Sequence, residues 1–180
     1  MVGKGKVIYL NGVTSTGKTT ISNAIQNMAN TNFYHMSFDM FQQMISMKFL
    51  HENYWKYLSE AIIATYHTAK TLSDMNINVI IDGMLLEMPE FQLNYQKSHY
   101  EIFKSIFSDS PVLLIEVFCP MEECRKRNIE RGDRGVDQSD WQNDNMAKNI
   151  EHDFSVNTFV NSSNVCAELI LNKLFGTPTI

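Results

Sequence analysis

Runs of apolar residues alternate along the chain with stretches in which apolar residues recur every three or four positions. A short apolar run bounded by turn residues predicts a buried strand, whereas the three-to-four spacing predicts a helix with one apolar face. Strands are predicted at 7–10, 33–38, 79–81, 111–118 and 154–158, helices at 19–29, 40–49, 54–75, 91–107, 121–130, 142–151 and 165–175, and a loop at 132–139.

This order of elements predicts one α/β domain over residues 1–180. Five strands that alternate with helices favour a parallel sheet with helices on both faces. The sequence contains no internal repeat, low-complexity segment or linker rich in proline or glycine, so it gives no indication of a second domain.

A complete phosphate-binding loop follows the first predicted strand. Residues 12–19 match the G-x-x-x-x-G-K-[ST] pattern between a strand and a helix, the context that this motif requires. Its glycines allow backbone N–H groups to turn toward phosphate oxygens, and the helix adds the positive end of its dipole. The alternative is a glycine-rich turn that matches by chance, which the context disfavours. The predicted nucleotide-binding residues are Gly12, Val13, Thr14, Ser15, Thr16, Gly17, Lys18, Thr19 and Thr20.

The motif gives specific roles to two of these residues. Lys18 is predicted to bridge the β- and γ-phosphates of ATP or another purine triphosphate such as GTP, and the Thr19 hydroxyl to coordinate Mg²⁺. Asp82, at the end of the strand 79–81, is predicted to hold a magnesium-bound water. The alternative for Asp82 is a turn or cap residue before Gly83.

All four arginines of the chain lie within ten residues of one another. Arg131 and Arg134 lie where a helix ends and a lid of about residues 131–145 is predicted. Guanidinium groups on a closing lid stabilise the charge on a transferring phosphoryl group, so both are catalytic candidates. Arg127 is a weaker third candidate, as a nucleotide ligand. A solvated helix face is the alternative, and it is preferred for Arg125.

No arginine occurs between Thr19 and Cys124, the part of the chain where an acceptor is expected to bind. Because bidentate arginine is the usual ligand of an acceptor phosphate, this favours a hydroxylated acceptor without one. An alcohol needs a base to orient and deprotonate its hydroxyl, and Asp39 is the candidate. An aspartate at a strand–helix junction is often a helix N-cap instead, and spacing alone leaves both roles open.

Charge, hydropathy and cysteine content restrict the expected partners and compartment. The net charge of −5 argues against nucleic acid as a main partner. No apolar run reaches the roughly 18–20 residues of a membrane span and no secretory leader is evident, so no membrane association is expected.

Three cysteines without metal-ligand spacing suit a reducing cytoplasm. The sequence gives no indication of an oligomeric state.

Together these residues resemble the chloramphenicol phosphotransferase-like family of P-loop kinases. The R-G-D-R segment followed by the run 152–158 is far more specific to that family than the phosphate loop. The resemblance implies a nucleoside-monophosphate-kinase-like P-loop NTPase fold with a lid, and an ATP-dependent O-phosphotransferase in which Asp39 is the base. It extends over most of the chain through Leu10-Asn11-Gly12, Lys18-Thr19, Phe38-Asp39, Ile80-Ile81-Asp82, Arg131-Gly132-Asp133-Arg134, 152–158, Ser163 and Cys166-Ala167.

The favoured interpretation is therefore a small-molecule O-kinase whose acceptor is hydroxylated and uncharged, antibiotics included. A nucleoside monophosphate kinase is one alternative, and the missing acceptor-side arginine counts against it. A toxin-like kinase or a nucleotide-dependent switch that acts on a larger partner is another.

Overall fold

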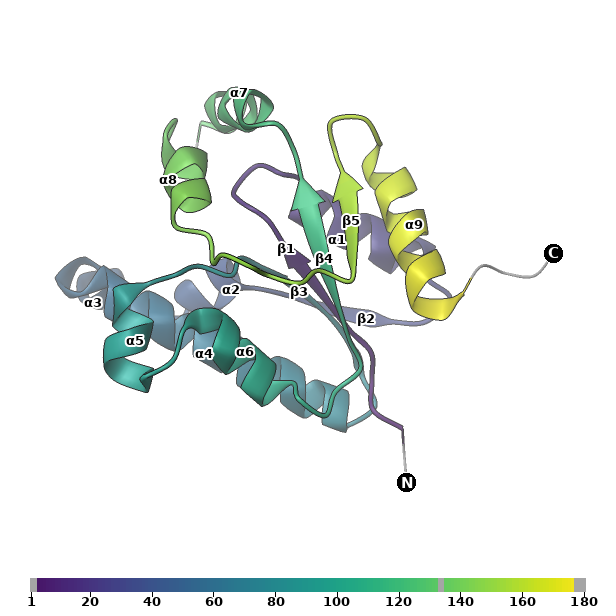
Figure 1. Cartoon of the computed structure of the whole chain (residues 1–180), viewed down its shortest axis with the longest axis horizontal. Helices are drawn as coiled ribbons and strands as arrows, with labels where there is room; N and C mark the ends of the chain where they lie inside the picture. Colours follow the sequence, from purple (N-terminus) through teal and green to yellow (C-terminus); the bar gives the residue numbers. More distant parts are fainter. Residues whose placement is uncertain (1–2, 133–134, 177–180) are drawn as a thin grey trace.

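A five-stranded parallel sheet forms the centre of the protein (Figure 1). The computed structural model describes residues 3–132 and 135–176. The strands are β1 (Val7–Asn11), β2 (Phe33–Ser37), β3 (Asn78–Gly83), β4 (Val112–Phe118) and β5 (Phe154–Asn157). Their order is β2-β3-β1-β4-β5, which places β1 in the middle and confirms the predicted parallel α/β sheet.

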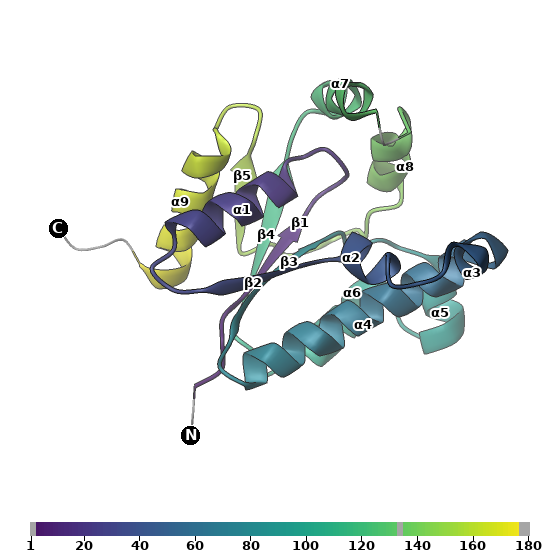
Figure 2. The ribbon, with the colours of Figure 1, turned by 180° about the vertical axis from the view of Figure 1, so that it is seen from behind.

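Helices cover both faces of the sheet (Figures 1 and 2). On one face lie α1 (Lys18–Met28) and α9 (Ser163–Phe175), and on the other α4 (Tyr54–Asp74), α5 (Pro89–Tyr95) and α6 (His99–Ile106). Successive residues of β1 belong to different cores: Ile8 packs with residues of α1 and α9, and Tyr9 with residues of α4 and α6. Burial on both faces explains why the strand is an uninterrupted apolar run.

The remaining helices lie at the carboxyl ends of the strands (Figure 1). They are α2 (Phe38–Gln42), α3 (Met47–Glu52), α7 (Met121–Arg131) and α8 (Gln138–Asp144). Open α/β sheets bind their ligands at this edge, because the loops that leave parallel strands converge there. The register pairs Asp82 of β3 with Leu10 of β1 and with Ser37 of β2. The carboxyl ends of these three strands, and the loops that follow them, therefore lie at the same height along the sheet.

The predicted helix at 40–49 is wrong, because two short helices occupy this region. The first, α2, is capped by the Ser37 hydroxyl, which accepts a hydrogen bond from the Met40 N–H. The N–H groups of Met44 and Ile45 then donate to carbonyls three residues earlier, a 3₁₀ pattern that tightens the last turn and ends the helix.

The predicted helix at 91–107 is also broken, into α5 and α6. Gln96 follows α5 with φ 53°, a left-handed conformation. Ser98 then caps α6: its hydroxyl accepts a hydrogen bond from the Glu101 N–H, and the Glu101 carboxylate accepts one from the Ser98 N–H. This reciprocal capping box starts a new helix at a position where the apolar periodicity alone suggested a continuous one.

The predicted helix at 142–151 is shorter and earlier, as α8. The Ala147 N–H donates to the Leu85 carbonyl, and the Glu87 N–H donates to the Asn145 carbonyl. The segment 85–87 thus forms the hydrogen bonds that these backbone groups would otherwise form within a further helical turn. The helix therefore stops before residue 147. The lid predicted at about 131–145 therefore contains α8, and its closing motion stays a prediction.

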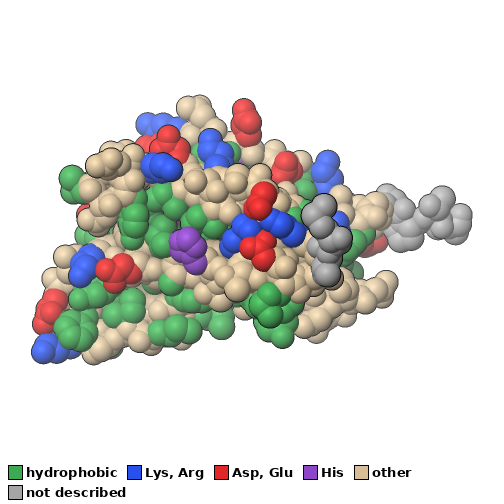
Figure 3. All heavy atoms as spheres, turned by 90° about the horizontal axis from the view of Figure 1, so that it is seen from below, with side chains coloured by type: hydrophobic (Ala, Val, Ile, Leu, Met, Phe, Trp, Pro, Cys, Tyr) green, Lys and Arg blue, Asp and Glu red, His purple; other side chains and the backbone are tan. Residues whose placement is uncertain are grey.

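The outer face of α4 to α6 carries a group of acidic and basic side chains among hydrophobic and neutral ones (Figure 3). Ion pairs between Lys4, Lys70, Asp74 and Asp109 join the N-terminal segment to α4 and to the turn after α6. In residues 3–132 and 135–176, no helix is long and apolar enough to cross a membrane.

Candidate active site

Two glycines give the phosphate loop its shape. A Cβ at Gly12 would lie 2.6 Å from the backbone oxygen of Val117, closer than side chains approach. Gly17 has φ 95°, a left-handed conformation that other residues rarely adopt. Since α1 begins directly after Gly17, the positive end of its dipole faces the loop. The loop is therefore an anion-binding turn at a helix N-terminus.

The ammonium group of Lys18 lies across this loop. Its Nζ donates hydrogen bonds to the carbonyl oxygens of Gly12 at 2.8 Å and Val13 at 2.9 Å. It also lies 3.9 Å from Oδ1 of Asp82. The loop and a neighbouring carboxylate thus hold a positive charge at the position where a nucleotide's phosphates would meet it.

Asp82 joins the end of β3 to the start of α1. Its Oδ2 accepts a 2.6 Å hydrogen bond from the Thr19 hydroxyl. Nε2 of His35 lies 3.5 Å from the same oxygen and is buried without a hydrogen-bond partner among the described residues. Burial by itself would raise the pKa of Asp82, but the neighbouring imidazole, ammonium and hydroxyl groups hold that pKa below its ordinary value. The carboxylate is therefore ionised at neutral pH.

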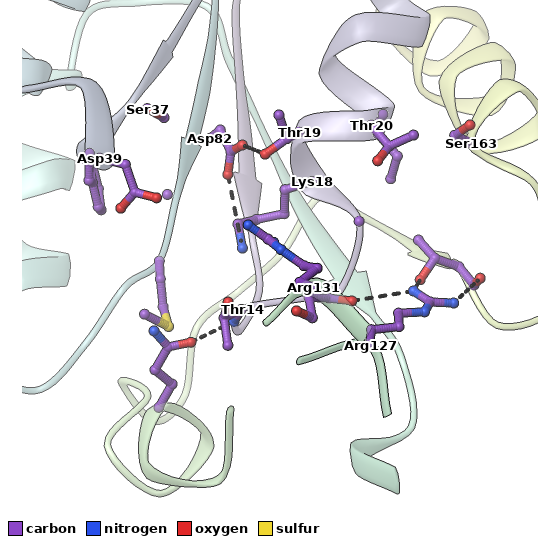
Figure 4. A pocket seen from close by; sticks show the side chains of 18 of the residues that line it. Thr14, Lys18, Thr19, Thr20, Ser37, Asp39, Asp82, Arg127, Arg131 and Ser163 are labelled. Carbon is purple, nitrogen blue, oxygen red and sulfur yellow. Dashed lines mark hydrogen bonds and ion pairs between the residues drawn. The ribbon is translucent and has the colours of Figure 1, made fainter. Parts of the chain in front are cut away.

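One cavity of about 830 Å³ joins these groups to α2 (Figure 4). Lys18 and Asp82 line its centre in this view, and Asp39 extends into it from the opposite side to Arg127. The part beside α2 and the loop after β3 is lined by Ser37, Phe38, Asp39, Gln43, Gly83 and Met84. A nucleotide and a second small molecule could therefore meet in a single space.

Asp39 lies in the first turn of α2 and is exposed. The N-cap of that helix is Ser37, whose side chain accepts the hydrogen bond from the Met40 N–H. The capping role that the sequence left open for Asp39 thus belongs to a different residue. Its carboxylate borders the cavity, and its role as a base stays a prediction.

Arg127 ties α7 to the phosphate loop. Its guanidinium donates to the Ser15 carbonyl at 3.3 Å and to the Thr158 carbonyl at 3.2 Å, and its Nε pairs with Glu123 at 3.1 Å. The Thr158 hydroxyl in turn donates to the Thr16 carbonyl at 2.7 Å. Arg127 therefore supports the loop backbone and borders the cavity, and a contact with nucleotide stays a prediction.

The other arginines occupy different environments. Arg131 ends α7 and its side chain extends into the cavity (Figure 4). Arg125 forms an exposed ion pair with Asp140 of α8 at 2.5 Å, as its surface assignment suggested. Arg134, the second predicted lid arginine, lies outside the described residues.

Two further residues at the site were missed by reasoning from the sequence. Oε1 of Gln142, on α8, accepts a 2.5 Å hydrogen bond from the Thr14 N–H. The buried Asn128 accepts a 2.6 Å hydrogen bond from the Ser15 hydroxyl and donates to the Ser139 hydroxyl at 3.1 Å. Both lie in polar stretches without a recognisable motif, so nothing local in the sequence marked them.

A match over nearly the whole chain identifies its family. A family model described as chloramphenicol phosphotransferase-like protein matches residues 5–175. The chain belongs to this family. "Putative O-phosphotransferase Rv2636" and "Putative O-phosphotransferase MT2714", from two strains of Mycobacterium tuberculosis, are each 22% identical over 179 residues, covering 86% of this chain and 76% of the relative. The resemblance seen in the sequence is thereby confirmed.

Solved structures of small-molecule kinases share the fold of this chain. The Mycobacterium tuberculosis APS kinase CysC, in complex with AMPPNP and APS, has a TM-score of 0.69 at 14% identity and covers 97% of this chain and 99% of its own. Shikimate kinase from Acinetobacter baumannii, in complex with shikimate, has a TM-score of 0.67 at 12% identity, and the match covers 99% of this chain and 97% of the shikimate kinase chain. The fold is therefore that of P-loop kinases, and family and fold together support a phosphotransferase.

Proposed function

We propose that this protein is an ATP-dependent O-phosphotransferase that moves the γ-phosphoryl group of ATP onto a hydroxyl of an uncharged small molecule. The observation that carries the proposal is the shared cavity, which Lys18 and Asp39 line from different elements. A cation beside the phosphate loop and a carboxylate beside the acceptor space are the two charges that such a reaction needs.

The reaction transfers one group and one proton. The bond from the γ-phosphorus to the oxygen that bridges it to ADP breaks, and its electron pair leaves on ADP. The acceptor oxygen forms the new bond to phosphorus, and its proton passes to Asp39. Lys18 and Arg131 stabilise the charge on the phosphoryl oxygens, as we propose also for Arg134.

The acceptor space favours a neutral compound. Its described lining combines Phe38 and Met84 with the neutral polar side chains of Ser37 and Gln43. Such a surface offers hydrogen bonds and apolar contact to a hydroxylated molecule, but no guanidinium for an acceptor phosphate. Antibiotics with free hydroxyl groups belong to this chemical class.

The Thr19 hydroxyl and the ionised Asp82 carboxylate suit Mg²⁺, because both are hard oxygen donors at the end of the phosphate loop. When bound, Mg²⁺ would neutralise part of the charge on the β- and γ-phosphates. The three cysteines are buried free thiols, which supports a reducing compartment, and we propose the cytoplasm.

An assay for the release of ADP from ATP, or of GDP from GTP, with magnesium and a library of hydroxylated metabolites, antibiotics and nucleoside monophosphates tests the proposal. Mass spectrometry should find one added phosphoryl group on a hydroxyl of a neutral compound. Lys18→Ala is the control and should lose at least about 10²-fold in turnover. Conversion of an added nucleoside monophosphate to its diphosphate would establish the monophosphate kinase alternative. Nucleotide binding without any phosphorylated small molecule would favour a switch or a kinase for a larger partner.

A further inference from the structure

The side chain of Gln142 is held on the backbone of the phosphate loop. Its Oε1 accepts a 2.5 Å hydrogen bond from the Thr14 N–H. A backbone N–H can only donate, so the atom that faces it must be the carbonyl oxygen of the carboxamide. The Nε2 group, with two N–H donors, is therefore on the other branch of the carboxamide, in a residue that borders the cavity.

The same peptide group also holds the loop lysine. The Val13 carbonyl accepts a hydrogen bond from Lys18 Nζ at 2.9 Å, while the Thr14 N–H of that peptide donates to Gln142. Lys18 and Gln142 thus bind one peptide plane from its two ends, because C=O and N–H of a trans peptide point in opposite directions. Gln142 lies next to the part of the loop where the terminal phosphoryl group is expected.

Several contacts fix the helix that carries Gln142. Trp141 stacks on Trp55 of α4, with ring centroids 5.1 Å apart. Ser139, on the same helix, is buried and bonded to Asn128, which also bonds to Ser15 of the phosphate loop. A donor held by such contacts needs little reorganisation when charge develops beside it, and this is the condition for strong electrostatic stabilisation.

We propose that Gln142 is a further catalytic residue, a carboxamide whose Nε2 donates a hydrogen bond to the phosphoryl group as it passes from ATP to the acceptor. The inference rests on the proposed phosphotransferase function. No proton moves in this contact, since the carboxamide only donates a hydrogen bond to a phosphoryl oxygen. The Thr14 N–H aims the group and, by polarising its carbonyl, strengthens its N–H donors.

The test compares the affinity of the full-length protein for magnesium ADP and for magnesium ADP with aluminium fluoride, a mimic of the phosphoryl group in transfer. Gln142→Met removes the donor and the acceptor, whereas Gln142→Glu keeps an oxygen for the Thr14 N–H and removes the donor. Asn143→Ala, exposed on the same helix, is the matched control. Gln142→Met should bind the aluminium fluoride complex at least about 10-fold more weakly, with ADP affinity unchanged, and Gln142→Glu, which also adds a negative charge beside the phosphates, should lose at least as much affinity for that complex. Asn143→Ala should bind both probes as wild type does.

Other results would overturn the inference. If Gln142→Glu binds both probes normally while Gln142→Met fails, Gln142 only supports the loop. If both variants bind ADP more tightly, the Gln142 side chain competes with the nucleotide for the phosphate loop and inhibits nucleotide binding. A wild-type protein that does not bind ADP would instead contradict the proposed phosphotransferase function. The experiment therefore distinguishes a wrong role for Gln142 from a wrong function for the protein.

Discussion

Trp55 on α4 and Trp141 on α8 stack with their ring centroids 5.1 Å apart and their planes at 26°. They are the two tryptophans of the chain. Because Trp55 lies at the start of α4, which covers the sheet, and Trp141 lies on α8 in the predicted lid, their stacking joins α8 to α4.

We expect this pair to give an exciton-coupled circular dichroism band. Trp55→Leu and Trp141→Leu should each remove the whole band, because coupling needs both rings. A double-mutant cycle on unfolding free energy should give a coupling of about 0.5–1.5 kcal/mol, typical of aromatic pairs. A band that survives in either single variant would show that the rings do not stack in solution.

Replacing Asp39 by Asn should stop transfer to the acceptor and leave ATP affinity unchanged. An amide cannot take the hydroxyl proton, and general bases contribute roughly 10²–10⁴-fold. Turnover with the acceptor and nucleotide affinity are the measurements. Since Ser37 caps α2, Ser37→Ala should instead lower the unfolding free energy by about 1 kcal/mol. Near-normal turnover in Asp39→Asn would mean that the base lies elsewhere.

Removal of the Arg131 guanidinium should act on kcat more than on KM for ATP. We expect a loss of about 10²–10³-fold for Arg131→Ala, since a lid arginine stabilises charge that exists only in the transition state. The sequence predicts the same for Arg134→Ala. Arg125→Ala is the comparison, because its exposed pair with Asp140 should matter little for stability or turnover. If Arg131→Ala only raises KM, that arginine binds the ground state.

His99 makes the stability of the fold depend on pH. It is fully buried, its Nδ1 accepts a hydrogen bond from the Leu86 N–H, and its Nε2 contacts the Tyr66 hydroxyl. Burial lowers the pKa of His99 from 6.5 to about 3. The unfolded chain therefore binds a proton that the native protein does not bind between these two pH values.

The stabilising contribution of neutral His99 is thus complete above about pH 6.5 and decreases as the pH falls toward 3. Between pH 6.5 and 5 one proton corresponds to about 2 kcal/mol. Urea unfolding of His99→Asn, which keeps an acceptor for the Leu86 N–H, should show a shallower pH slope than wild type. His67→Asn, exposed on α4, should keep the wild-type slope. Equal slopes in wild type and His99→Asn would contradict the assignment.

Local sequence patterns were sufficient to predict features that a single short segment specifies. Residues 12–19 specify the phosphate loop, because their backbone turns and the following helix form one continuous unit. The apolar runs at β1 and β3 specify the central strands, since a strand buried on both faces is largely apolar. Asp82 was predictable because it ends such a run.

The tertiary structure decided the contacts and helix ends that depend on residues distant in the sequence. Gln142 and Thr14 are 128 residues apart, and no local pattern could pair them. The helix predicted at 142–151 stops early because an extended segment near Leu85 supplies its backbone hydrogen bonds. Asp39 shares a cavity with Lys18 only because β2 and β1 end at the same edge of a parallel sheet. The sequence by itself thus determined the nucleotide loop and the alternation of elements, whereas packing decided which side chains meet across the cavity.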